Sequence, residues 1–288
     1  MMSIETLLFR KRKIQTPGVF LQQRAPIRAI PTHLQSVVER KINGNHIFLE
    51  AGEGKPIIFC HGLFGGIFNL ESVCTAIAGR YRLIMPYLPM YDLPLRDCTV
   101  QNLGEYLASF IEDNRLEEVV LVGSSMGGGS ALYYATRAND NLKGLVLCGS
   151  SGLSTIPMSK GYFKRKDLSF VREAVSDIFF DRSVPPEEMV LDVFNALQDY
   201  ETVIRSIRFT KSATRQMMQD KLPGIQTPVL LVWGKQDPIT PVNIAPKFRQ
   251  LLPNASLHII DECGHVPTQE KPGQFLQHFF DFLKKINY

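Results

Sequence analysis

The sequence predicts an α/β protein with a mostly parallel, eight-stranded sheet, helices on both faces of the sheet and a helical insertion. Short runs rich in Val, Ile and Leu alternate with stretches of helical period, as expected for parallel strands joined by helices. The alternation stops at about residue 152 and resumes at about residue 225. With 288 residues, 44% of them hydrophobic, the chain is long enough to bury one large core.

The eight expected strands fall into two groups. Residues 34–41 and 46–51 are joined through Asn43-Gly44, a strong hairpin signal, so the sheet is expected to begin with an antiparallel pair. The other six are apolar runs typical of buried parallel strands, at residues 56–60, 81–85, 118–122, 142–148, 229–233 and 256–260. Helices are expected over about residues 70–79, 100–114, 127–137, 242–252 and 272–286.

This order of elements divides the chain into three parts. Residues 34–152 and 225–288 are expected to form one core domain, because the strand and helix rhythm is the same in both. Residues 153–224 show almost no strand signal and are expected to form a helical cap over the edge of the sheet. Residues 1–33 are interpreted as a basic N-terminal arm.

The positive charge is concentrated near the N-terminus. The first 45 residues carry eight Lys and Arg against two acids, and the rest carries 24 basic and 26 acidic residues, which excludes a uniformly basic nucleic-acid-binding domain. The run Leu7 to Lys13 suits contact with an anionic membrane surface or another protein, and equally a solvated terminus, which we favour because the run is short. No apolar run approaches the roughly 18 residues of a transmembrane segment.

The cysteines predict neither disulfides nor a metal site. They are five in number, form no Cys-x-x-Cys pair and follow no recognisable secretory signal, so we expect free thiols and a cytoplasmic location. No metal or organic cofactor is expected, because the chain has neither Cys/His metal-ligand spacing nor a phosphate-binding Gly-x-Gly-x-x-Gly motif.

The segment Gly123-Ser124-Ser125-Met126-Gly127 fits the pattern Gly-x-Ser-x-Gly and lies between an expected strand and an expected helix. In such a turn the central serine adopts a strained conformation that exposes its hydroxyl, and glycines leave room for the close approach of backbone. Ser125 is therefore the candidate nucleophile, although Gly-rich turns without catalytic function also contain this pattern.

A serine hydroxyl needs a base within hydrogen-bonding distance. Of the six histidines, His33, His46 and His278 are interpreted as surface residues and His258 as a packed strand residue, which leaves His61 and His265. We favour His265 because it lies in the loop between the last strand and the last helix. Asp237, which follows the preceding strand, is the candidate partner of His265, although Asp-Pro is also a common turn dipeptide.

Acyl transfer also needs donors for an oxyanion. Met126 offers its backbone N–H at the start of a helix. The second donor is sought in the loop from His61 to Gly66, where we prefer the N–H of Leu63 and keep Phe64 as the alternative.

Taken together, four motifs in order resemble the α/β-hydrolase superfamily, in its capped single-domain group, over residues 35–288. They are His61-Gly62, Gly123-x-Ser125-x-Gly127, Gly234-x-x-Asp237 and Gly264-His265. The resemblance implies a carboxylesterase-like serine hydrolase that acts on a small, largely apolar substrate through an acyl-enzyme and needs no cofactor. The chain is expected to be a monomer or homodimer.

Other activities on the same fold stay open. Hydrolases that cleave carbon–carbon bonds in ring-fission dienoic products share a Ser-Met-Gly-Gly run like that starting at Ser125. Many of them, however, have an asparagine before the serine and a tryptophan after the histidine, where this chain has Ser124 and Val266. Perhydrolases and slow-turnover ligand receptors are further alternatives.

Overall fold

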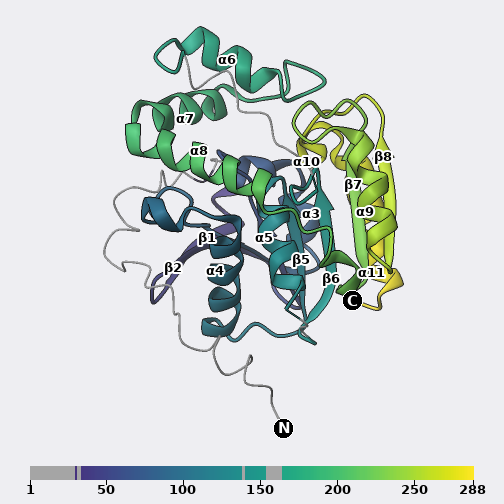
Figure 1. Ribbon diagram of the computed structural model, residues 1–288. Helices are drawn as coiled ribbons and strands as arrows, with labels where there is room; N and C mark the ends of the chain where they lie inside the picture. The colour runs from purple at the N-terminus through teal and green to yellow at the C-terminus, as the bar shows by residue number, and fades with distance from the viewer. Residues whose placement is uncertain (1–29, 31–33, 138–139, 154–163) are drawn as a thin grey trace.

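A computed structural model describes residue 30 and residues 34–137, 140–153 and 164–288 of the chain. These residues form an eight-stranded sheet in the order β1-β2-β4-β3-β5-β6-β7-β8 (Figure 1). β2 pairs antiparallel with β1 and with β4, and the other five strand pairs are parallel, so the predicted mostly parallel sheet is confirmed. The strands are β1 Val38–Asn43, β2 His46–Ala51, β3 Pro56–Cys60, β4 Arg82–Pro86, β5 Val119–Ser124, β6 Leu142–Cys148, β7 Val229–Gly234 and β8 Ala255–Ile260.

The predicted hairpin is present, but its position is shifted. The first strand begins at Val38 rather than at residue 34, because Leu34 lies in a turn and is buried in the core instead. Asn43 pairs with His46, so the two loop residues are Gly44 and Asn45, and Gly44 takes the position of positive φ (56°). Glycine adopts this backbone conformation without the steric cost that other residues meet.

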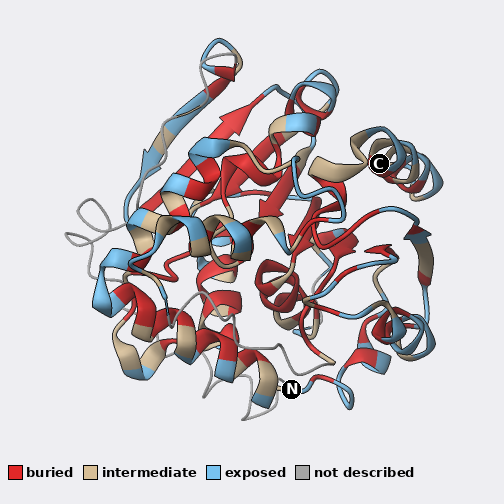
Figure 2. Ribbon diagram, turned by 90° about the horizontal axis from the view of Figure 1, so that it is seen from above, coloured by how far each residue is buried: buried red, intermediate tan, exposed pale blue. Residues whose placement is uncertain are grey.

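Helices cover both faces of the sheet. Their bounds are α3 Glu71–Ala78, α4 Val100–Asp113, α5 Met126–Ala135, α6 Leu168–Ser176, α7 Glu187–Gln198, α8 Tyr200–Arg215, α9 Ala245–Leu251, α10 Pro267–Glu270 and α11 Pro272–Lys285. One apolar cluster joins α4, α5 and α9 to the sheet, and a second joins α3 and α11 to it. Seen from above, the central strands are buried, the edge strand β1 is largely exposed, and the helices are exposed mainly on their outer sides (Figure 2). The helix expected over residues 242–252 is a 3₁₀ turn followed by α9, with Pro246 in the first turn of α9.

The helical insertion, defined here as residues 164–224, lies between β6 and β7 and contains α6, α7 and α8 (Figure 1). These helices form a third apolar cluster of their own, which Phe68 and Val266 of the core also join. Helix α8 packs against both the insertion and the core, since its Val203 lies in the insertion cluster and its Phe209 lies in the core cluster that includes α4, α5 and α9. The insertion is thus packed directly on the core.

The basic arm expected at residues 1–33 lies outside the described residues, apart from residue 30. Among the residues that are described, no helix combines the length and apolar character needed to cross a membrane.

Candidate active site

Ser125 occupies a strained turn between β5 and α5. Its backbone has φ 54° and ψ −117°, a conformation that costs a non-glycine residue energy. Hydrogen bonds hold it there: the N–H of Ser125 donates to Cys148 O at 3.0 Å, and Ser125 O accepts from the N–H of Ser151 at 3.0 Å and of Gly128 at 3.1 Å. Ser125 itself is half-buried between buried neighbours, so its side chain stays accessible.

The glycines beside Ser125 are required by close packing. A Cβ atom on Gly127 would lie 2.0 Å from Cys60 O, and one on Gly123 would lie 2.5 Å from the Cα of Gly128. A Cβ on Gly62 would lie 3.0 Å from the Cβ of Ser125. These contacts bring the loop after β3 against the turn that holds Ser125.

Asp237 and His265 are hydrogen-bonded to each other. Nδ1 of His265 lies 2.8 Å from Oδ2 and 3.0 Å from Oδ1 of Asp237, in the loops after β7 and β8. The carboxylate is fully buried and the imidazole nearly so. An ionised carboxylate can only accept, so Nδ1 must carry the proton, and Nε2 of the neutral ring is left as the acceptor. This is the tautomer that a general base requires.

Asp237 also forms the turn that its sequence context suggested. Its Oδ1 accepts the N–H groups of Ile239 and Thr240, both at 2.8 Å, and its Oδ2 accepts the Thr240 hydroxyl at 2.7 Å. Burial alone would raise the pKa of Asp237, but electrostatic attraction to His265 and the hydrogen bonds from His265 and Thr240 outweigh it, so the pKa is lowered. The turn former and the histidine partner are therefore the same residue.

The end of β6 and the residue that follows it contact both Ser125 and His265. Cys148 O accepts from the Ser125 N–H, and a Cβ on the next residue, Gly149, would lie 3.1 Å from Nδ1 of His265. Within the described part of the chain, no hydrogen bond joins the Ser125 hydroxyl to His265. The structure thus pairs Asp237 with His265 and places both at the same edge of the sheet as Ser125.

The backbone N–H groups of Leu63 and Met126, the two candidate oxyanion donors, donate no hydrogen bond to any described residue. The alternative donor, the N–H of Phe64, is occupied, since it donates to the Tyr91 hydroxyl at 2.8 Å. Phe64 also has a positive φ of 56°, which turns the loop sharply after Leu63. The sequence contained no signal for this role of Tyr91, which comes from the loop after β4.

Both ring nitrogens of His61 are hydrogen-bonded to backbone groups, so neither is left to take a proton from a serine. Its Nε2 accepts from the Leu88 N–H at 3.2 Å, so Nδ1 carries the proton and donates to Gly62 O at 2.9 Å. This neutral ring joins the loop after β3 to the loop after β4. His61 is thus placed to support the loop rather than to act as a base.

The remaining histidines lie elsewhere. His258 and His278 stack on each other with ring centroids 3.9 Å apart, and His33 lies outside the described residues. His46 was interpreted as a surface residue, which is wrong. It is buried against Tyr106 and Phe110, with Nε2 2.9 Å from Asp113, because the first hairpin packs over α4.

The cysteines offer no competing nucleophile. All five are free and buried. Burial raises the pKa of Cys60 and of Cys148, at the ends of β3 and β6, to about 12, so both stay protonated near neutral pH. Among the described residues, no group of His, Cys, Asp and Glu is arranged to hold a metal ion.

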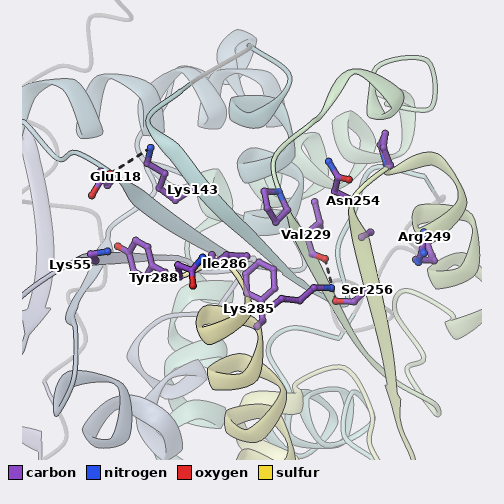
Figure 3. A pocket seen from close by; sticks show the side chains of 15 residues that line it. Lys55, Glu118, Lys143, Val229, Arg249, Asn254, Ser256, Lys285, Ile286 and Tyr288 are labelled. Atoms are coloured by element: carbon purple, nitrogen blue, oxygen red, sulfur yellow. Dashed lines mark hydrogen bonds and ion pairs between the residues drawn. The ribbon is translucent and has the colours of Figure 1, made fainter.

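A groove of about 670 Å³ lies at the other end of the sheet (Figure 3). It is lined by residues at the amino ends of β3, β5, β6, β7 and β8, by α9 and by the end of α11, among them Lys55, Lys143, Arg249 and Lys285. Ser125, Asp237 and His265 are not among the residues that line it. The candidate site lies instead at the carboxyl ends of the strands, where open α/β sheets bind ligands.

Comparison with known proteins identifies the family of the chain. A family model described as the α/β-hydrolase fold matches residues 55–272. An uncharacterized hydrolase of Bacillus subtilis, YugF, is 26% identical over 262 residues, 84% of this chain and 96% of that protein. The 2-hydroxy-6-oxo-6-phenylhexa-2,4-dienoate hydrolase of Comamonas testosteroni is 26% identical over 261 residues, 82% of this chain and 90% of that protein.

Among solved structures, an α/β-hydrolase enzyme from a sediment metagenome of the Mar Chica lagoon, Morocco, superposes with a TM-score of 0.71 at 31% identity. The match covers 87% of this chain and 100% of that one. The fold, the strained serine after β5 and these similarities lead to one conclusion: the chain belongs to the α/β-hydrolase family.

Proposed function

We propose that this hydrolase is a serine esterase that cleaves a carboxylic ester, or a similar acyl bond, of a small and largely apolar substrate. The observation that carries the proposal is the buried hydrogen bond from Nδ1 of His265 to Asp237, at the same edge of the sheet as the strained Ser125. It supplies an oriented base beside an accessible hydroxyl, as acyl transfer by serine requires.

In the proposed reaction Ser125 attacks the ester carbonyl while Nε2 of His265 takes the hydroxyl proton. The free N–H groups of Leu63 and Met126 stabilise the oxyanion, each contributing roughly 3 kcal/mol. His265 then protonates the leaving alcohol and activates a water molecule, which releases the acid from Ser125. Hydroxyl–imidazole hydrogen bonds are often long in unliganded enzymes, and substrate binding is expected to bring Ser125 and His265 into contact.

The preference for an apolar substrate rests on the side chains around the site. Leu63 and Phe64 are partly buried against the core, and Phe64 also contacts the apolar cluster of the insertion, which includes Phe68 and Val266. We propose that the insertion acts as a cap, with the acyl or alkyl group of the substrate between it and the sheet. The five buried free thiols support a reducing cytoplasm as the location.

Replacing Ser125 tests the proposal. Ser125→Ala is expected to lower kcat for p-nitrophenyl acetate and butyrate by at least about 10³-fold, because the nucleophile is lost. Ser124→Ala removes a buried hydroxyl next to it and is the matched control, expected to stay within a few-fold of wild type. A Ser125→Ala enzyme that retains a tenth or more of wild-type turnover would contradict the nucleophile assignment.

A second candidate is hydrolysis of a carbon–carbon bond in a ring-fission dienoate. The favouring observation is that a relative covered over 90% of its length carries the name of such a hydrolase, and that this chain shares the run Ser125 to Gly128. Many carbon–carbon hydrolases have an asparagine and a tryptophan where this chain has Ser124 and Val266. Ester hydrolysis is therefore the first candidate.

One comparison separates these candidates. The wild-type enzyme is given p-nitrophenyl esters of increasing chain length alongside a 2-hydroxy-6-oxo-dienoate, and kcat/KM is measured for each. A higher kcat/KM for the dienoate than for every ester would replace the first candidate by the second. A single turnover per protein molecule, with no repeated release of product, would instead indicate a slow receptor.

A further inference from the structure

The Glu270 carboxylate accepts three backbone N–H groups. Glu270 ends the short helix α10, five residues after His265. Its Oε2 accepts from Phe180 at 2.7 Å and from Gly264 at 2.9 Å, and its Oε1 accepts from Val266 at 3.1 Å. Hydrogen bonds to an ionised acceptor are stronger than neutral ones. This side chain therefore joins two parts of the backbone, the loop that contains His265 and the segment that contains Phe180.

Two of these donors flank His265. Gly264 precedes it and Val266 follows it, and the N–H of His265 itself donates to Ile178 O at 2.8 Å. Three successive backbone N–H groups of this loop are thus fixed, two of them by Glu270. The direction in which the imidazole leaves the backbone depends on these bonds, because Asp237 holds the ring only at Nδ1.

The third donor belongs to the helical insertion. Phe180 lies with Ile178 in the connection between α6 and α7, and this connection touches the His265 loop. A Cβ on Gly264 would lie 2.5 Å from Ile178 O and 2.8 Å from Phe180 N, so no side chain fits between them. Phe179 and Val266 both join the apolar cluster of the insertion. Movement of this connection would therefore reach the backbone of His265.

We infer that Glu270 is a positioning residue, which couples the placement of the helical insertion to the orientation of the base His265. Its effect on catalysis rests on the function proposed above. Removal of the carboxylate leaves three N–H groups without their acceptor, so the loop shifts to find new partners. Substrate binding is affected much less, because Glu270 acts through the backbone and not through contact with the substrate.

Three variants test the inference. Glu270→Ala removes both acceptor oxygens. Glu270→Gln keeps one oxygen, which suits Phe180 and Gly264, and turns an amide donor toward Val266. Glu188→Ala removes an exposed carboxylate of α7 and is the matched control. Each protein is assayed for kcat and KM with a short p-nitrophenyl ester, and its folded fraction is measured by circular dichroism and urea denaturation.

The expected result is a kcat lower by about 10- to 100-fold for Glu270→Ala, with KM within about threefold of wild type. Glu270→Gln should fall between Glu270→Ala and wild type, and Glu188→Ala should match wild type. A loss confined to stability, with kcat per folded molecule within twofold of wild type, would overturn the inference. If Glu270→Ala does not fold, Glu270→Gln serves instead, and a kcat per folded molecule within twofold of wild type for that variant would overturn the inference.

A readout that needs no turnover separates this inference from the proposed function. In ¹⁵N-histidine-labelled protein, the Nδ1 proton that His265 shares with Asp237 gives a strongly downfield resonance. This resonance is expected to broaden or disappear in Glu270→Ala and to persist in Glu188→Ala. If wild type turns over neither ester nor dienoate, the proposed function fails, and an unchanged resonance in Glu270→Ala would refute the positioning role on its own.

Discussion

Replacing Gly149 by alanine should disturb the Asp237–His265 pair without removing either residue. A Cβ at this position would lie 2.9 Å from Oδ2 of Asp237 and 3.1 Å from Nδ1 of His265. Ordinary contact begins at about 3.4 Å, so the carboxylate must move by about 0.5 Å. The hydrogen bond between the two side chains is only 2.8 Å long and cannot absorb that movement unchanged.

The magnitude follows from this displacement. A misplacement of about 1 Å costs roughly 10²-fold in rate, so about 0.5 Å should cost roughly tenfold in kcat. Gly149 also has a φ of +49°, which costs alanine about 1 kcal/mol of stability. Gly44→Ala is the matched control, because Gly44 has a φ of +56° and nothing lies within 4 Å of its Cβ position.

Both variants are compared by urea denaturation and by ester hydrolysis at equal folded concentration. Both should lose about 1 kcal/mol of unfolding free energy. Only Gly149→Ala should lose activity as well. Equal kcat values for the two variants would refute the idea that Gly149 keeps this space open for the Asp237–His265 contact.

Two further substitutions probe charges. Asp237→Asn should lower kcat by about 10³- to 10⁴-fold with little change in KM, because an amide can donate to Nδ1 and favours the wrong tautomer of His265; unchanged kcat would contradict this. Glu50→Gln should cost about 1–2 kcal/mol at neutral pH, a modest value because the partners Lys41 and Arg82 are 42% and 35% exposed. Burial alone would raise the pKa of Glu50, but hydrogen bonds from Arg82 and Lys41 lower it below its ordinary 4.5. Its contribution is therefore complete above pH 4.5 and lost as the pH falls, so the variant and wild-type stabilities should converge in acid; a constant gap from pH 7 to 3 would contradict this.

Patterns local to the chain were enough to predict the layout of the core. The apolar runs and the helical periods between them predict the order of strands and helices, since both depend on residues close in sequence. The predicted start of the first strand at Leu34 and the predicted hairpin loop at Asn43-Gly44 were wrong by a few residues, because core packing and strand pairing determine these positions. His46 was misplaced for the same reason, as α4, which covers it, lies more than 50 residues further along the chain.

In the candidate site, too, some features follow from local sequence and others depend on residues far apart in the chain. Ser125 and its glycines could be recognised from one pentapeptide, because the demands of a tight turn are local. Whether Phe64 or Leu63 has a free N–H depends on Tyr91, 27 residues away, and the support of His265 depends on Phe180, 90 residues from Glu270. Hydrogen bonds of this kind have directional requirements that no short sequence pattern records. Sequence patterns therefore predicted which side chains would carry the chemistry, whereas only the folded chain showed what holds them in place.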